Sequence, residues 1–150
     1  MAEKMSKAPK LFLALLAVIF IVYFLSDKDT KPEKKYDFSR VIPASKTQIR
    51  YLKQGIKKET GVSVSNCYAC KTKSMSNVYF IACKLNGPGV NNEIGVWAKN
   101  GAPNSPGMTY SVNGMATEFS NYPNGSRTKA GISMRDDGAE LVKIYVSERK

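Results

Sequence analysis

The longest apolar stretch of the chain is residues 11–25, which read LFLALLAVIFIVYFL and contain no charged side chain. As an α-helix this stretch would be about 22 Å long, somewhat shorter than the roughly 30 Å hydrocarbon core of a bilayer. Lys10 and Lys28 flank it and can reach the two interfaces, which compensates for the short length. The residues at its exit lack the small-x-small pattern that signal peptidase requires. We therefore predict an uncleaved transmembrane signal anchor, with a removed signal peptide as the alternative.

Charge and composition on either side of this segment predict how the chain is divided. Residues 1–10 form a short tail with lysines, the usual cytoplasmic end of a signal anchor. Positive residues are slightly more numerous after the segment, which alone would favour the opposite orientation. Residues 26–40 carry both signs of charge and Pro32, as expected for a solvated tether. We expect residues 41–150 to form one exported domain of a single-pass inner-membrane protein.

The pattern at 45–60 predicts an amphipathic helix. Ser45 followed by Gln48 fits a capping box at its start, and Gly61 is suited to cap its end. Apolar residues recur at spacings of three and four, namely Ile49, Leu52 and Ile56.

Beyond this helix the pattern changes to that of strands. Alternation begins at Val62, and the aromatic and β-branched runs 78–83 and 94–98 are typical of buried strands. Residues 71–77 and 86–89 have the polar and glycine-rich composition of connecting loops. We expect an antiparallel sheet with one face packed by the helix and the other in water.

The last third of the chain is ambiguous. Residues 109–120 are consistent with a strand followed by a short helix. Residues 139–147 fit a helix whose start is capped by Ser133 and Asp136, or a strand after a hairpin turn, and we prefer the helix. The helix would bury Leu141, Ile144 and Tyr145; the strand would bury Val142, Ile144 and Val146. The expected fold class is α+β: one N-terminal transmembrane helix, then an antiparallel sheet of three or more strands packed by two or three helices.

Composition argues against catalysis. The chain has no histidine, so it lacks the commonest general base and the commonest metal ligand. Asp136 and Asp137 are adjacent acids, but both fall in a cap or turn signature where aspartate is expected anyway. We predict no catalytic residues, no metal site and no cofactor.

The three cysteines predict one structural disulfide across a hairpin. We favour Cys70 with Cys83, because this pair closes a shorter loop than Cys67 with Cys83 does. Cys67 would then be buried or available to a partner. The Cys-x-x-Cys pair leaves a redox dithiol of Cys67 and Cys70 as an alternative.

Four basic residues of the predicted helix form a stripe: Lys46, Arg50, Lys53 and Lys57. On an ideal helix they lie within about 60° of one another, beside the apolar stripe. Such a stripe can meet anionic lipid, a polyanionic glycan or an acidic protein, or it can simply be a solvated face. The formal net charge of +11 often indicates nucleic-acid binding, but an exported domain rarely meets nucleic acid.

These observations favour a non-enzymatic, membrane-anchored envelope protein. Its basic exported domain would bind another envelope component, either a protein or an anionic polymer, with the bilayer as its other contact. Accessory subunits of envelope machines and proteins that exclude foreign elements both fit this description. The alternatives are a thiol-active envelope protein and a purely structural spacer.

Overall fold

The computed structural model describes residues 36–101, 103–104 and 107–149. The predicted tail, the predicted transmembrane segment and most of the predicted tether lie outside the described residues. Within the described part, no helix has both the length and the apolar character that crossing a membrane requires. The folded unit begins at Tyr36, a few residues before the boundary expected from composition.

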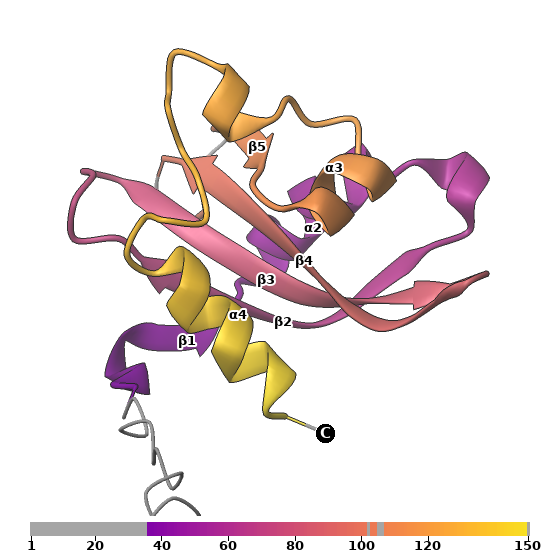
Figure 1. The fold of residues 1–150 in the computed structure, drawn as a ribbon, viewed down its shortest axis with the longest axis horizontal. Coiled ribbons are helices and arrows are strands. Elements are labelled where there is room, and N and C mark those ends of the chain that lie inside the picture. The colour runs from indigo at the N-terminus through magenta and orange to yellow at the C-terminus, as the bar shows by residue number, and fades with distance from the viewer. Residues whose placement is uncertain (1–35, 102, 105–106, 150) are drawn as a thin grey trace, which may run out of the picture. The chain divides into compact units, whose positions relative to one another are not determined.

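The domain is built on five antiparallel strands that neighbour one another in chain order (Figure 1). The loop predicted at 71–77 is confirmed at 72–77, and the turn predicted at 86–89 is confirmed but contains only the two residues between β3 and β4. The strand predicted at 94–98 is longer than expected. The strands are β1 (Val41–Pro43), β2 (Ser63–Lys71), β3 (Val78–Gly87), β4 (Val90–Asn100) and β5 (Thr109–Ser111).

Helices cover both faces of this sheet, so the small α+β domain is confirmed but the expected wet face is wrong. Helices α2 (Lys46–Gly55) and α3 (Gly114–Phe119) pack on one face, and α4 (Ala139–Ser147) crosses the other (Figure 1). Each face has its own apolar core: Trp97 and Ile81 of the sheet share one core with Leu52 of α2, whereas Phe80 of the sheet shares the other with Val142 of α4. The helix at 139–147 was predicted, but its packing on the second face of the sheet was not.

The predicted start of α2 is confirmed. The Ser45 side chain accepts a hydrogen bond from the Gln48 amide at 3.1 Å, and the Gln48 side chain accepts one from the Ser45 amide at 2.8 Å. This capping box satisfies two backbone donors that the first turn would otherwise leave unpaired.

The predicted end of α2 is wrong by five residues. The helix stops at Gly55, whose carbonyl accepts a hydrogen bond from the Asn121 amide at 2.8 Å. The Tyr122 ring lies against Gly55, where a Cβ atom would be only 2.2 Å from it. Contacts with a distant segment therefore end the helix, and Gly61 ends the following 3-10 turn (Lys58–Thr60) instead.

The helix that we preferred for residues 139–147 is confirmed, but its start and buried stripe differ. It begins after Gly138, and the hydrogen bond from the Ser133 amide to the Asp136 carboxylate closes a turn before it. Its buried residues are Ala139, Val142 and Val146, not Leu141, Ile144 and Tyr145. Both stripes are apolar, so periodicity alone does not distinguish them.

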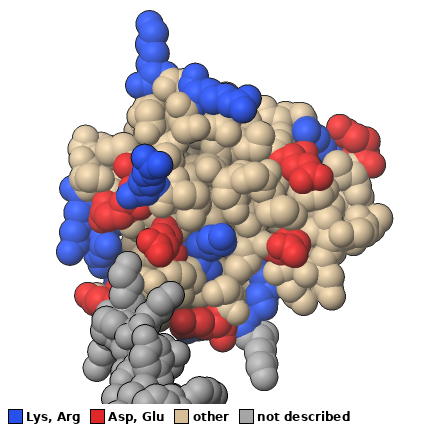
Figure 2. Space-filling model, in the orientation of Figure 1, with Lys and Arg blue, Asp and Glu red and all other residues tan. Residues whose placement is uncertain are grey.

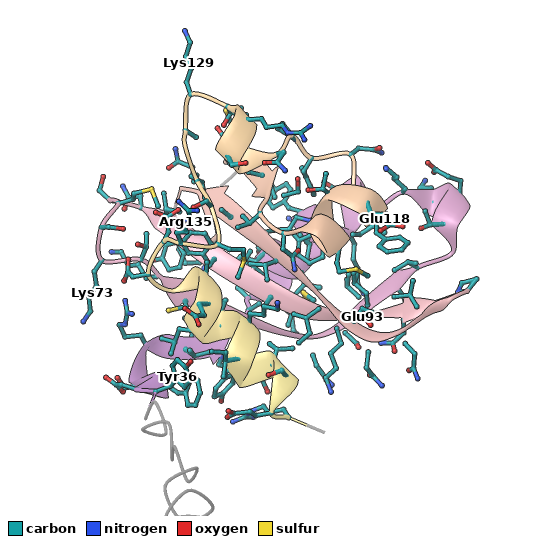
Figure 3. All side chains as sticks on the ribbon, in the orientation of Figure 1. Tyr36, Lys73, Glu93, Glu118, Lys129 and Arg135 are labelled. Atoms are coloured by element: carbon teal, nitrogen blue, oxygen red, sulfur yellow. A yellow bond between two sulfur atoms is a disulfide. The ribbon has the colours of Figure 1, made fainter. Side chains whose placement is uncertain are left out.

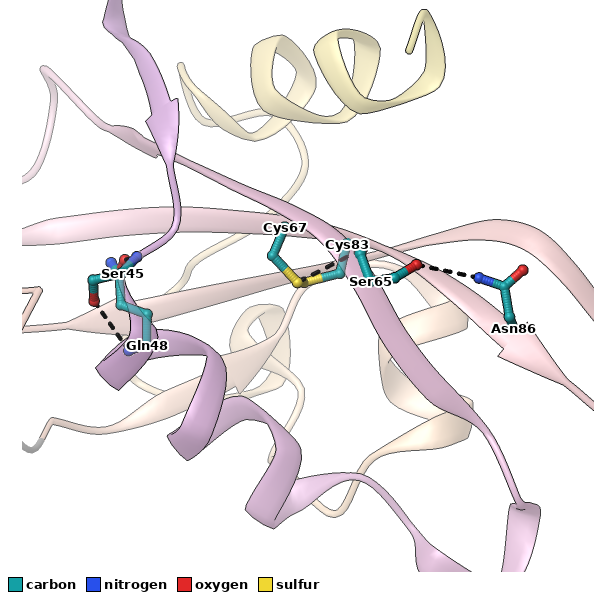
Figure 4. The surroundings of a disulfide bond; sticks show 6 residues. All are labelled: Ser45, Gln48, Ser65, Cys67, Cys83 and Asn86. Carbon is teal, nitrogen blue, oxygen red and sulfur yellow. Dashed lines mark hydrogen bonds between the residues drawn. A yellow bond between two sulfur atoms is a disulfide. The ribbon is translucent and has the colours of Figure 1, made fainter. Parts of the chain in front are cut away.

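The disulfide joins Cys67 of β2 to Cys83 of β3, so the expected Cys70–Cys83 pair is wrong (Figure 4). Cys70 is the free cysteine and is fully buried. Cys67 and Cys83 belong to the core under α2, whereas Cys70 belongs to the core under α4. Cys83 pairs with Cys67 because both side chains lie on the same face of the sheet, although the loop that this bond closes is the longer one.

A β-bulge in β2 brings Cys67 opposite its partner. The pairing with β3 shifts between Ser65 and Tyr68, which leaves Asn66 and Cys67 opposite Cys83. Asn66 adopts a positive φ of 47°, a conformation that asparagine tolerates better than most residues. Simple alternation along β2 therefore fails across this point.

Thiol labelling of the denatured, unreduced protein tests the pairing. We expect one reactive thiol in the wild type, none in Cys70→Ser and two in Cys67→Ser. Because the bond links residues 16 apart, its loss in Cys67→Ser should lower the free energy of unfolding by about 3 kcal/mol in urea titrations. Any reactive thiol in Cys70→Ser would contradict the Cys67–Cys83 bond.

Candidate functional site

The exposed side of α2 carries most of the predicted basic stripe. Gln48 and Leu52 are buried against the core, whereas Lys46, Arg50, Lys53 and Gln54 are exposed. There the surface forms a shallow hollow of about 510 Å³, which we call the basic hollow. Its lining residues are Lys46, Ile49, Arg50, Lys53, Gln54 and Lys58.

The structure brings together three of the four predicted stripe residues: Lys46, Arg50 and Lys53. Lys57 lies beyond the end of α2, and its ammonium group donates a hydrogen bond to the Glu118 carbonyl of α3 at 2.7 Å. It therefore links the segment after α2 to α3 and does not line the hollow. Lys58 lines the hollow in its place. The prediction did not include Lys58, because it assumed an ideal helix through residue 60, whereas the helix ends at Gly55.

A second, smaller hollow of about 260 Å³ adjoins the first, and we call it the edge hollow. Lys53 and Lys58 line both hollows. The remaining lining of the edge hollow is apolar apart from one serine: Ile56, Val62, Ser63 and Val64. The two hollows together form a surface with an aliphatic floor and a cationic rim.

The charge of the basic hollow differs from that of the opposite face of the domain. Four of its six lining residues are cationic and none of the six is acidic. On the face that carries α4, acidic and basic side chains lie next to one another (Figure 2). Clustered charge of one sign creates a local potential, whereas mixed charge largely cancels it.

Asp136 accepts a hydrogen bond from the Ser133 amide and closes a turn, as predicted, whereas Asp137 contacts residues distant in the sequence and does not act as a cap. The Asp137 carboxylate accepts hydrogen bonds from Arg40 at 2.8 Å and from the Lys73 amide at 3.0 Å. It also accepts hydrogen bonds from Thr72 and Ser74, so it holds the β2–β3 loop next to the start of the domain. Burial alone would raise the pKa of Asp137, but these donors outweigh it and hold the pKa well below its usual range.

The cysteines do not form the dithiol that the redox alternative requires. Cys67 is bonded to Cys83, and Cys70 lies on the opposite face of the sheet. Burial raises the pKa of the Cys70 thiol, which disfavours the reactive thiolate. Across the described residues, no three Cys, Asp or Glu side chains gather as metal ligands would.

Substituting Asp137 should weaken the fold and change its response to acid. The lowered pKa means that the ionised carboxylate stabilises the folded state above the usual aspartate value of 3.8, and that this contribution is lost as the pH falls below it. Asp137→Asn should therefore lower the free energy of unfolding by about 1 kcal/mol near pH 7 and flatten its decline between pH 5 and pH 2. Urea titrations at several pH values measure both effects.

Glu93→Gln is the control, because Glu93 is an exposed carboxylate on β4 (Figure 3). The acid response of this variant should match that of the wild type. An Asp137→Asn variant with an unchanged acid response would show that the Asp137 contacts do not stabilise the loop.

Comparison with known protein families, with curated proteins and with solved structures finds no match to this chain. The function of the basic hollow is therefore inferred from its own residues and geometry.

Proposed function

We propose that the chain is a single-pass membrane protein whose exported domain binds an anionic component of the envelope through the basic hollow, without catalysing a reaction. The observation that supports this proposal is that four cationic side chains and no acidic one line a hollow beside α2. Lysine and arginine next to an anionic surface each contribute about 1 kcal/mol to binding.

The rigidity of the surroundings supports a binding role. The capping box fixes the start of α2, and the contacts of Gly55 with Tyr122 and Asn121 fix its end. The cations on α2 are therefore presented on a scaffold that does not need to be ordered when a partner binds, which lowers the entropic cost of association.

Two features support an exported domain. A disulfide within the sheet is favoured in an oxidising compartment and is rare in the cytosol. The apolar sequence at 11–25, with lysines on both sides, is suited to anchoring the chain in a bilayer.

Crosslinking in intact cells tests the proposal. A photoreactive amino acid in place of Gln54, an exposed residue of the hollow, should capture the bound component. Introducing Lys53→Glu and Lys58→Glu together into that protein should reduce the captured product by roughly tenfold, because two attractive charges become repulsive. The yield is measured by immunoblotting against the full-length chain.

The matched control reverses two lysines away from the hollow, Lys129 and Lys143. Both side chains are exposed, and Lys129 extends into solvent from a loop far from α2 (Figure 3). The control lowers the net charge by the same amount, so capture should stay close to the wild-type level. If both double variants lost the same amount of captured product, the loss would be due to net charge alone, and the hollow would be rejected as the binding site.

A further inference from the structure

The N-terminal half of β2 has an open edge. β1 pairs with β2 only through Tyr68, Ala69 and Cys70. Among the residues that the structure describes, no strand runs beside residues 63–66 on the side away from β3. An antiparallel strand directs its backbone N–H and C=O groups alternately to its two sides, so this stretch presents unpaired groups outward.

The exposed side chains of this stretch leave the backbone edge accessible. Ser63 donates a hydrogen bond to the Asn86 carbonyl at 3.1 Å, and the Asn86 side chain donates one to Ser65 at 3.4 Å (Figure 4). Both serine hydroxyls are therefore directed to β3. The stretch contains neither a charged residue nor a proline, the residues that commonly protect an edge from pairing.

The edge hollow lies against this same stretch. Ser63 and Val64 belong to its lining, and its rim carries Lys53 and Lys58, which the basic hollow shares. An open backbone edge, an apolar depression and a cationic rim thus meet at one place. A lipid headgroup or a glycan would use the cations, but it would not form the ladder of backbone hydrogen bonds that an added strand forms.

We propose that an acidic segment of a partner protein adds to the sheet as an extended strand along residues 63–66. Its backbone pairs with β2, an apolar side chain enters the edge hollow, and its carboxylates lie near Lys53 and Lys58. This inference rests on the proposed function and specifies its partner. A second copy of this chain is a poor occupant, because pairing two such edges would bring the same lysines and two strongly positive domains together.

Strand addition of this kind draws its affinity from main-chain hydrogen bonds and its specificity from alternate side chains. The full-length chain in detergent is therefore titrated with a pool of fluorescent peptides of roughly nine residues, a common strand length, in which Glu alternates with Val, Ile, Leu or Phe. We expect the acidic pool to bind, and a pool with Lys in place of Glu to bind at least about tenfold more weakly.

Methylation of the peptide backbone separates strand pairing from charge attraction. Two further acidic pools carry N-methyl groups on alternate residues, one pool on the odd positions and the other on the even positions. Because only one edge of an added strand pairs with β2, one of these pools should lose binding and the other should retain it. Equal binding of both methylated pools would overturn strand addition.

Substitution of the edge provides a second measurement. Ser65→Glu places a negative charge on the exposed edge and should weaken binding of the acidic pool by roughly tenfold. Ser76→Glu, in the exposed β2–β3 loop, makes the same change at the other end of the hairpin and should leave binding unchanged.

The outcomes distinguish this inference from the proposed function. No binding of the acidic pool would reject strand addition, whereas charge-dependent crosslinking in cells would still support the basic hollow. Competition of the peptides by phosphatidylglycerol vesicles, with no difference between the methylated pools, would identify a lipid surface and would also reject the inference. Loss of both peptide binding and charge-dependent crosslinking would reject the two proposals together.

Discussion

The bulge at Asn66 and Cys67 determines which side chains of β2 face α2. Val62 and Val64 precede it and Ala69 follows it, yet all three belong to the core under α2. A regular strand would turn residues 64 and 69 to opposite faces, because the side-chain period is two. The extra residue restores the alignment, so the disulfide and the contribution of β2 to the core beneath α2 depend on this irregularity.

The end of α2 is connected to the centre of the sheet through Trp97. The Trp97 ring packs over Gly95, where a Cβ atom would approach it to 2.2 Å, and the indole N–H donates a hydrogen bond to Ser120 at 3.1 Å. Ser120 also forms an isolated bridge with Ile56, directly after the helix. The fully buried Trp97 therefore connects the centre of the sheet to the end of α2. Because α2 carries Lys46, Arg50 and Lys53, this connection also determines where these cations lie.

Local signals in the sequence predict much of this domain, and the failures occur where distant contacts decide. The capping box at Ser45 and the hairpin loop at 71–77 depend on neighbouring residues, so their patterns predict them correctly. The end of α2 depends on the segment around Tyr122, and the disulfide depends on a positive φ at Asn66; neither leaves a periodic signal. The same holds for the candidate site: its three cationic residues inside the helix were predicted, whereas Lys58, which lies after the helix, was not.

The open edge and the basic hollow have a common origin in the residues that follow β1. Pro43 has no backbone N–H, so it cannot extend the ladder as a full partner of β2. The last hydrogen bond on this side runs from the Ala44 amide to the Cys67 carbonyl at 3.0 Å, and Ser45 then caps α2. Residues 43–45 therefore both end the strand and lead into the helix. Because the chain leaves the sheet at this point, α2 brings its lysines to the side of β2 that β1 no longer covers.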